Sequence, residues 1–336
     1  MTNKKTKLGV AFIAVMMIAV LLAGCSGNTS GGDLPKEVTI GYQVIPNAEL
    51  LVKTKGLAEQ QFPDVKINWQ PFDSGRDVNT AFAAGSIDLG LVGSVPVAIG
   101  VANALPYKVY FLHDIIGAAE SLAVRNEAGV TDIAGLVGKK VATPFGSTAH
   151  FSLLSALKLG GVDPQAVTIL DLQPQDLLAA WQRKDIDAAF VWNPVLARLL
   201  EDDGSIIITA EELSQQGAIT ADVGLVREQF AEEYPEFVHG YISVLDDAVK
   251  LYRDNPQEVA TALAPILSTT EEDVLDQASQ LVWLTSEEQA DSSYLGSDTA
   301  NSGFAAVLQQ TGEFLVEQGQ IQSAPSLETF RDAIWR

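Results

Sequence analysis

Apolar and polar residues along most of the chain follow two periods, one typical of strands and one typical of helices. Residues 38–42 and 65–69 alternate as half-buried strands do, and 48–59 and 77–84 follow the helical period. The next expected elements are a buried strand at 88–92, a helix at 96–102 and a strand at 109–112. This βαβαβ order favours a mostly parallel sheet with helices on both faces.

The pattern then restarts, which predicts a second α/β unit. Its expected strands lie at 121–125, 140–143, 168–172 and 188–191, and its expected helices at 148–159 and 175–183. Residues 181–194 weakly repeat 82–95, each running from a helix end through a polar turn into an apolar strand. The rest of the chain is predicted to be helical at 228–254, 256–267, 271–281, 301–318 and 328–335.

Two such units and a helical C-terminal part predict a two-lobed α/β protein. We expect the first lobe to contain residues 37–119 and 224–336, and the second to contain 120–223. The chain would cross between lobes near Glu120 and return near Asp222. A ligand would then lie in a cleft between the lobes, at the carboxyl ends of the strands.

The N-terminus predicts export. Three lysines precede an unbroken apolar run, Leu8 to Leu22, which is short for a membrane span. The run ends in Leu-Ala-Gly-Cys, which resembles a bacterial lipobox, so we expect a lipoprotein signal peptide at 1–24 and a lipid on Cys25. Residues 25–36 would be a flexible tether. The alternative is an uncleaved membrane anchor. On the first interpretation the body lies outside the cytoplasm and is anchored to the cell membrane.

Composition excludes several function classes. Cys25 is the one cysteine among 336 residues, so neither an intrachain disulfide nor a thiol zinc site can form. The net charge is −22, and removal of residues 1–24, which hold three lysines and no acids, makes it −25. Nucleic acid is therefore not an expected partner, because binding phosphates needs clustered lysine and arginine.

Two turns carry the candidate chemistry. Val92–Pro96 and Pro144–His150 each follow a short apolar strand and open a helix. A helix that begins in this way presents free backbone N–H groups and its positive dipole end, which together suit an anion. One such turn in each predicted lobe indicates a cleft that binds a small anionic or zwitterionic solute.

The chain resembles the taurine-binding proteins of bacterial ABC importers, within a wider group that binds sulfonates, nitrate and pyrimidine precursors. The resemblance covers most of the chain from Val38 onward, and it implies the type II periplasmic-binding-protein-like fold. The segments that carry it are Ile40–Gln43, Phe72–Gly75, Asp88–Pro96, Pro144–Leu154, Leu172–Pro174, Ala179–Asp187 and Val191–Pro194. The sequence departs from the expected pattern at Val95, Gly146, Ala149–Phe151 and Gly224.

Taurine carries a sulfonate and an ammonium group two carbons apart, so the resemblance implies a site with two halves. The expected sulfonate donors are Gln43, Ser94, Ser147, Thr148 and His150. The ammonium would lie against Asp222, or less favourably Glu120, with Trp192 and Trp283 as cation–π faces. Plainer roles also fit these residues: helix caps for the hydroxyls, a core position for the histidine and tryptophans, and hinge ion pairs for the acids.

The sequence predicts a binding protein rather than an enzyme. His113, His150 and His239 are far apart, and the motifs of metal, serine-nucleophile and phosphate-loop sites are missing. We therefore expect no cofactor and no metal, and the expected partners are a small solute and the permease subunits of an ABC importer. The alternatives are a binder of another small anion or zwitterion, such as an alkanesulfonate, nitrate or a pyrimidine precursor, and a sensor domain that docks on a receptor.

Overall fold

The computed structural model describes residues 34–297 and 301–336. The predicted signal peptide, Cys25 and the predicted tether as far as Asp33 lie outside the described residues. The part of the chain from Leu34 to Arg336 is one compact unit. Within these residues, no helix has the length and apolar character that a membrane crossing requires.

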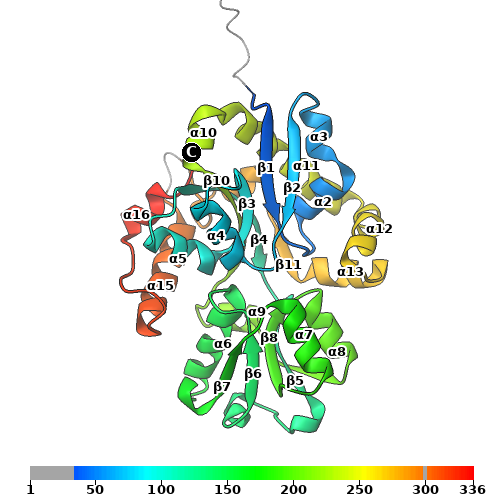
Figure 1. Ribbon diagram of the computed structural model, residues 1–336, viewed down its shortest axis with the longest axis vertical. Coiled ribbons are helices and arrows are strands. Elements are labelled where there is room, and N and C mark those ends of the chain that lie inside the picture. The colour runs from blue at the N-terminus through cyan, green and yellow to red at the C-terminus, as the bar shows by residue number, and fades with distance from the viewer. Residues whose placement is uncertain (1–33, 298–300) are drawn as a thin grey trace, which may run out of the picture. The chain divides into compact units, whose positions relative to one another are not determined.

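The described residues form two sheets, each covered by helices (Figure 1). The first sheet has six strands: β1 (Glu37–Tyr42), β2 (Lys66–Pro71), β3 (Leu89–Gly93), β4 (Tyr107–Ile116), β10 (Ala221–Arg227) and β11 (Leu281–Trp283). Their order is β11-β4-β10-β3-β1-β2. β1, β2 and β3 run parallel, whereas β10 is antiparallel to both neighbours and β11 is antiparallel to β4.

The second sheet, over the same described ranges, has five strands. They are β5 (Glu120–Arg125), β6 (Lys140–Thr143), β7 (Thr168–Asp171), β8 (Ala188–Trp192) and β9 (Gly204–Thr209), in the order β7-β6-β8-β5-β9. β6, β7 and β8 are parallel, and β5 is antiparallel to β8 and β9. The predicted α/β fold is confirmed, although both sheets are mixed rather than mostly parallel.

We call each sheet with its packed helices a lobe. The first lobe has α2 (Ala48–Lys55), α3 (Leu57–Gln61), α4 (Gly75–Ala83), α5 (Ser94–Ala102), α10 (Glu228–Glu233), α11 (Pro235–Asp254), α12 (Pro256–Leu267), α13 (Glu271–Ser279), α14 (Ser286–Gln289), α15 (Gly303–Glu317) and α16 (Leu327–Asp332). The second lobe has α6 (Thr148–Leu159), α7 (Pro174–Gln182), α8 (Val195–Glu201) and α9 (Ala210–Ser214), with single 3-10 turns at Asn126–Ala128, Ile133–Leu136 and Pro164–Ala166.

Local chemistry explains where two expected helices break. The helix expected at 48–59 divides into α2 and α3 because Gly56 adopts a left-handed conformation, with φ of 62°, and caps α2. The helix expected at 228–254 divides into α10 and α11 at Pro235, which starts α11 because proline fits the first helical turn. α6 and α12 have the bounds that the sequence predicts.

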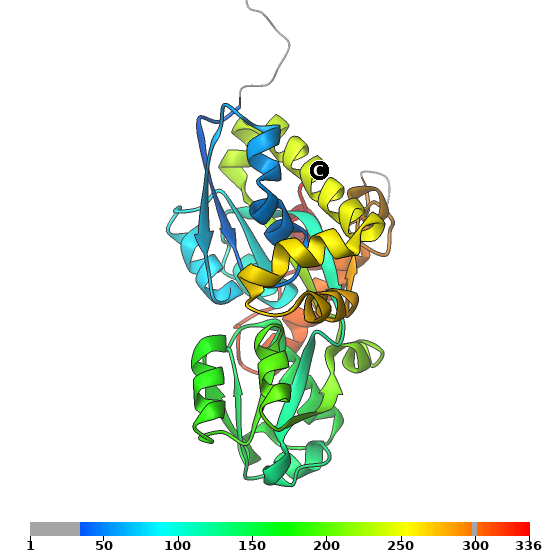
Figure 2. The same ribbon diagram turned by 90° about the vertical axis from the view of Figure 1, so that its right-hand side faces the viewer.

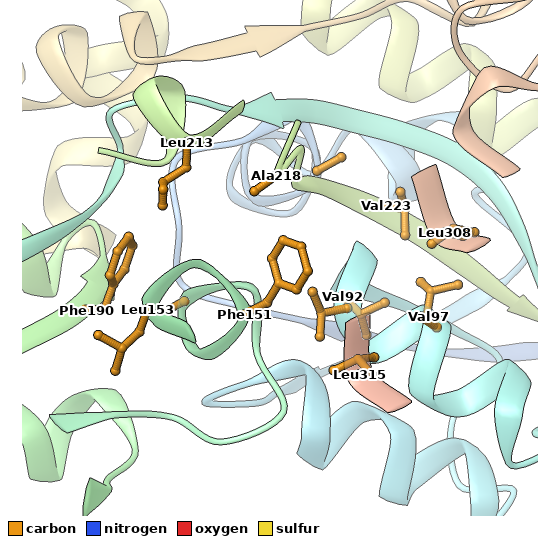
Figure 3. Close-up of a cluster of buried hydrophobic side chains, with 14 of the residues drawn as sticks. Val92, Val97, Phe151, Leu153, Phe190, Leu213, Ala218, Val223, Leu308 and Leu315 are labelled. Carbon is orange, nitrogen blue, oxygen red and sulfur yellow. The ribbon is translucent and has the colours of Figure 1, made fainter. Parts of the chain in front are cut away.

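Both faces of the first sheet are buried. α2, α11 and α12 pack on one face, and α4, α5 and α15 pack on the other, as Figures 1 and 2 show from two sides. The apolar cluster on the face covered by α4, α5 and α15 continues into the second lobe (Figure 3). There Phe151 of α6 lies between Leu153 and Phe190 of that lobe and Val92 and Leu315 of the first. The lobes therefore share apolar contacts as well as their two connections.

The chain crosses between the lobes twice, and the two crossings lie side by side. β4 ends at Ile116 and β5 begins at Glu120, and the return enters β10 at Ala221. The Ile116 N–H donates a hydrogen bond to the Thr220 carbonyl at 3.0 Å, which joins the crossings. The predicted lobe limits, 37–119 with 224–336 and 120–223, stay a prediction, and the first three residues of β10 pair within the first sheet.

Candidate functional site

A cleft lies between the lobes beside the crossings. It holds about 500 Å³ of free space, including its open mouth. Its lining comes from strand ends and helix starts of both lobes: Gln43, Ile45, Pro46, Gly75, Gly93, Pro96, Ile116, Ala119, Glu120, Ser147, Thr148, Trp192, Asn193, Asp222 and Leu281. Six of the nine predicted ligand-binding residues are among them, and these lining residues include neither lysine nor arginine.

Four helices begin at the cleft. Gly75 starts α4, Gly93 is the N-cap of α5, Ser147 is the N-cap of α6, and Pro46 directly precedes the N-cap of α2. Helix starts offer unpaired N–H groups and a partial positive charge. The cleft thus presents positive dipole ends without a basic side chain, which suits an anionic group.

The start of α6 is tightly organised. The Ser147 hydroxyl donates to the Pro144 carbonyl at 2.6 Å and accepts from the His150 N–H at 3.2 Å, so it caps the helix as the sequence predicts. The Thr148 hydroxyl donates to Glu120 Oε2 at 2.5 Å, and the Ser152 hydroxyl donates to Glu120 Oε1 at 3.2 Å. Glu120 is therefore held against α6 by two hydroxyl groups.

The cleft also contains acidic groups, Glu120 and Asp222. Burial raises the pKa of Glu120 to about 8, an effect that the Thr148 hydrogen bond opposes and the charge of Asp222 reinforces. Burial also raises the pKa of Asp222 to about 7. Asp114, which the sequence analysis did not single out, is fully buried, and burial together with Asp222 raises its pKa well above the usual range.

Gln43 and Trp192 complete the predicted residues that line the cleft. Gln43 donates one amide N–H to the Leu91 carbonyl at 3.0 Å, which fixes its side chain and leaves its second N–H free of that bond. Trp192 ends β8, is partly exposed and lines the cleft wall.

Three predicted site residues do not line the cleft. Ser94 is not the N-cap of α5, because Gly93 holds that position, and its buried hydroxyl accepts from the Ala221 N–H at 3.3 Å. The His150 ring stacks on Phe145 at 4.4 Å and accepts from the Gly146 N–H, and burial lowers its pKa to about 4.

Trp283 is the third. Its buried ring stacks on Tyr252 of α11, with 4.3 Å between ring centroids, and lies in the core of the first lobe. A core tryptophan cannot offer a face to a solute in the cleft without rearrangement of that core. The cation–π role is thus left to Trp192 among the two tryptophans that the sequence suggests.

Polar contacts join the lobes on two sides of the cleft. Arg76 of α4 pairs with Asp171 at the end of β7 at 2.7 Å, and the same aspartate accepts from the Phe145 N–H at 2.9 Å. On another side the Asn193 amide donates to Gln280 Oε1 at 3.3 Å. Both contacts join the two lobes, and Asp171 also holds the turn that precedes α6.

Sequence reasoning missed some lining residues and also the buried acid Asp114, which does not line the cleft. Gly75 and Asn193 stand inside segments that carry the family resemblance, Phe72–Gly75 and Val191–Pro194, so the signal for them was present. Asp114 had a weaker signal, as an acid inside the otherwise largely apolar strand β4. Ile116 and Leu281 gave no sequence signal, because an aliphatic residue at a cleft wall has the same hydrophobic pattern as one in a core.

The comparisons with known proteins agree with this architecture. A family model described as the NMT1-like family matches residues 32–268. The chain belongs to the NMT1-like family. The taurine-binding periplasmic protein of Escherichia coli K12 is 34% identical to this chain over 290 residues, which cover 84% of this chain and 87% of that protein.

Solved structures share the fold of this NMT1-like protein. The alkanesulfonate-binding protein SsuA from Xanthomonas axonopodis pv. citri, bound to MOPS, matches with a TM-score of 0.76 and 24% identity, over 91% of this chain and all of that one. The desulfurization enzyme DszB matches with a TM-score of 0.61 and 15% identity, over 88% and 96%. At these identities the likeness concerns the fold, which hosts both binding proteins and enzymes.

Proposed function

We propose that this protein is the extracytoplasmic solute-binding component of an ABC importer and that it binds taurine or a closely related amino-sulfonate. The E. coli relative that is 34% identical over most of the chain is a taurine-binding periplasmic protein. Two of the segments that carry the family resemblance, Phe72–Gly75 and Val191–Pro194, contribute residues to the cleft. The lipid on Cys25 and delivery to a membrane permease belong to the same proposal.

One observation carries the choice of ligand. The cleft has helix starts in its wall, Glu120 held against the start of α6, and the carboxyl group of Asp222 among its lining, with no lysine or arginine among its lining residues. A plain anion would gain the helix dipoles but also face the carboxyl groups. A zwitterion can place its negative group against the free N–H groups and its positive group against Asp222, so the cleft favours a zwitterion.

The sulfonate would lie against the starts of α5 and α6. Free backbone N–H groups there and the second amide N–H of Gln43 can contribute donors, whereas the Ser147 and Thr148 hydroxyls already donate to the Pro144 carbonyl and to Glu120. Each charge-assisted hydrogen bond contributes about 1.5–3 kcal/mol where water is excluded. Several together would offset the loss of hydration of one sulfonate.

The ammonium would lie against Asp222, with Trp192 as a neighbouring ring. Asp222 lines the cleft and is partly exposed, whereas Glu120 is buried and already accepts two hydroxyl hydrogen bonds. The less committed carboxylate is the better partner for a new donor. We therefore assign the ammonium contact to Asp222 rather than Glu120.

Binding would be completed by closure of the lobes. Donors of α6 belong to the second lobe and those of α5 to the first, so a ligand that contacts both favours the state in which they are close. The Arg76–Asp171 pair and the Asn193–Gln280 contact would stabilise that state. The closed form would then deliver the solute to the permease.

We infer that the protein is not an enzyme. The lining residues include no histidine and no cysteine, and the buried hydroxyls at the start of α6 have no base beside them other than Glu120, which burial keeps protonated near neutral pH. Incubation with taurine should leave it chemically unchanged, as mass spectrometry would show. Formation of sulfite or of an aldehyde would contradict the proposal.

Isothermal titration of the purified protein tests the proposal, with taurine, ethanesulfonate and β-alanine as ligands. Because sulfonate buffers such as MOPS would compete, the titrations use phosphate or Tris at pH 8. Tight binding of taurine with much weaker binding of ethanesulfonate and β-alanine is expected, since each of these lacks one of the two charged groups. Equal affinity for ethanesulfonate would remove the ammonium half of the site, and no binding of any of the three would overturn the proposal.

The variant Asp222→Asn tests the assigned ammonium contact. Loss of one charge-assisted contact should weaken taurine binding about 10- to 100-fold, while any binding of ethanesulfonate should change little or improve. The matched control is Asp247→Asn on the exposed face of α11, which should leave both affinities unchanged. An unchanged taurine affinity in Asp222→Asn would make Asp222 a structural residue.

A further inference from the structure

Asp114 is a buried acid without a donor. Its side chain has no exposed surface, and neither carboxyl oxygen accepts a hydrogen bond from any group in the described ranges. It stands in β4 among residues that are largely apolar. A buried carboxylate in this position would cost much free energy, so its presence calls for a partner that satisfies it.

The strand register supplies that partner. Asp114 lies directly opposite Asp222 in the antiparallel β4–β10 pair, so both side chains leave the same face of the sheet. The Cβ atoms of such a pair are about 4.5–5.5 Å apart, within reach of contact between two carboxyl groups. Ile116, two residues along β4 and on the same face, lines the cleft. Asp114 therefore lies beside Asp222, whose carboxyl group lines the cleft.

The titratable groups around Asp114, among the described residues, include no cation that is paired with it. β11 places Trp283 opposite Asp114, and that residue does not titrate. On the helices that pack on β4, Glu288 of α14 is paired with Arg253, and Tyr241 of α11 donates to Glu49. Glu120 of β5 is a third acid near Asp222, and His113, the neighbour of Asp114 in β4, lies 3.9 Å from Glu49. None of these is a cation paired with Asp114, so the proton that stabilises the pair is its own.

We propose that Asp114 is a neutral, proton-carrying positioning residue that donates a hydrogen bond to the Asp222 carboxylate and so holds the negative charge that binds the ammonium group of the solute. This inference rests on the proposed function. It adds a residue behind the site rather than a second ligand contact. Burial and the neighbouring acid act in the same direction, since both raise the pKa of Asp114.

Two substitutions of Asp114 separate this role from its alternatives. Asp114→Asn keeps a neutral donor, and Asp114→Leu keeps the volume but removes the donor. Taurine should bind Asp114→Asn within about threefold of the wild type and Asp114→Leu at least about tenfold more weakly, the loss of one hydrogen bond to a charged group. Ethanesulfonate affinity should stay within about threefold in both. Asp247→Leu, on the exposed face of α11, is the control.

The pH dependence of taurine affinity distinguishes this role from a purely structural one, which would leave that dependence unchanged. As the pH falls, Asp222 becomes protonated and taurine binding weakens. Without the donor from residue 114 the Asp222 carboxylate is less stable, so this weakening should begin about one pH unit higher in Asp114→Leu than in the wild type and Asp114→Asn. Thermal unfolding of each variant shows whether it is folded.

Three outcomes overturn the proposal. Asp114→Asn that binds taurine as weakly as Asp222→Asn would mean that Asp114 is charged and contacts the ligand. Asp114→Leu with wild-type affinity and pH profile would mean that it has no role. If Asp114→Leu lost as much affinity for ethanesulfonate as for taurine, the substitution would disturb the whole cleft.

A second measurement keeps the proposal testable where Asp114→Leu does not fold or the wild type binds no taurine. Carbon-13 NMR of the aspartate carboxyl groups in the unliganded protein should show Asp114 protonated through the pH range in which Asp222 ionises. An Asp114 carboxyl that titrates in the ordinary aspartate range would contradict the pair. Failure of taurine binding together with a protonated Asp114 would refute the proposed function alone.

Discussion

Thr148 contributes to the cleft through a single hydroxyl group. Its donor bond to Glu120 at 2.5 Å holds the glutamate in place, while its backbone N–H lies in the first turn of α6. Thr148→Val removes the hydroxyl but keeps the shape, so taurine binding should weaken about tenfold, the cost of one lost hydrogen bond near a charge.

Thr148→Ser provides the matched control for this variant, because it restores the hydroxyl and should restore affinity to within about threefold. Isothermal titration measures both. Wild-type affinity in Thr148→Val would show that the hydroxyl is not part of the site, and poor binding in Thr148→Ser would attribute the effect to the methyl group instead.

Glu49 makes the stability of the protein depend on pH. It is fully buried in α2, where burial raises its pKa to about 8, opposed by the hydrogen bond from Tyr241. Because the folded state holds this proton more tightly than the unfolded chain, the stabilisation is complete below pH 4.5 and is lost as the pH rises toward 8. Each pH unit in that window costs about 1.4 kcal/mol.

The variant Glu49→Gln, which is neutral at every pH, should therefore lose less stability than the wild type between pH 5 and pH 8. Urea unfolding at several pH values in this range measures the difference. Glu236→Gln, at an exposed position of α11, should keep the wild-type slope. A slope in Glu49→Gln equal to that of the wild type would show that Glu49 ionises normally in the folded protein.

Single residues were the hardest part to predict from sequence. The turns that hold Ser147 and Thr148 were predictable because a cap at a helix start has a recognisable pattern. His150 and Trp283 were not, because an aromatic side chain at helical or strand spacing can point to a cleft or to a core, and only packing decides. Asp114 needed the β4–β10 register, which pairs residues over one hundred positions apart.

Among the elements, the start of α5 and the start of α6 meet across the cleft. A Cβ atom built at Gly93, the N-cap of α5, would lie 2.5 Å from Cγ2 of Thr148. Glycine is therefore required there by the approach of the two lobes rather than by its own backbone, whose φ is −75°. Close approach of the two lobes therefore depends on glycine at position 93.

Gly93→Ala should hold the lobes slightly apart. Taurine affinity should fall at least about tenfold, equivalent to 1.4 kcal/mol, while the thermal stability of the unliganded protein should change little because each lobe keeps its core. Gly312→Ala in α15 is the control, since its Cβ would meet neighbours at 3.5 Å, an ordinary contact. Unchanged affinity in Gly93→Ala would show that the lobes do not approach this closely when ligand is bound.

Most elements followed from the hydrophobic pattern, and the exceptions have physical reasons. α6 and α12 matched because their caps and apolar faces agree. The antiparallel strands β9 and β11 were not expected, since a short edge strand such as Gly204–Thr209 or Leu281–Trp283 has little periodicity to detect. Because these two strands were not predicted, the sheets were expected to be more parallel than they are.

For the molecule as a whole, the net charge repels anions, whereas the helix starts in the cleft attract them. The chain has a net charge of −22, which repels anions at long range, although salt screens this beyond about 8–10 Å. A solute whose only charged group is a sulfonate is repelled by that charge, whereas a zwitterion has no net charge and is not. Local dipoles at helix starts and the carboxyl groups of the cleft then determine which solute is retained.

The two-lobed plan was predictable because it depends on many residues, each contributing a little. Alternating strands and helices, restarted once, required two sheets, and the strand ends placed the cleft between them. The polarity of that cleft was not predictable as a whole, because four helix starts and two acids come together only through the fold.

A crystal structure of the protein with bound taurine would test the proposed site directly. The sulfonate should lie at the starts of α5 and α6, in contact with Ser147 or Thr148, and the nitrogen should lie within hydrogen-bond distance of Asp222. A taurine in the reverse orientation, or one bound outside this cleft, would overturn the proposed binding mode.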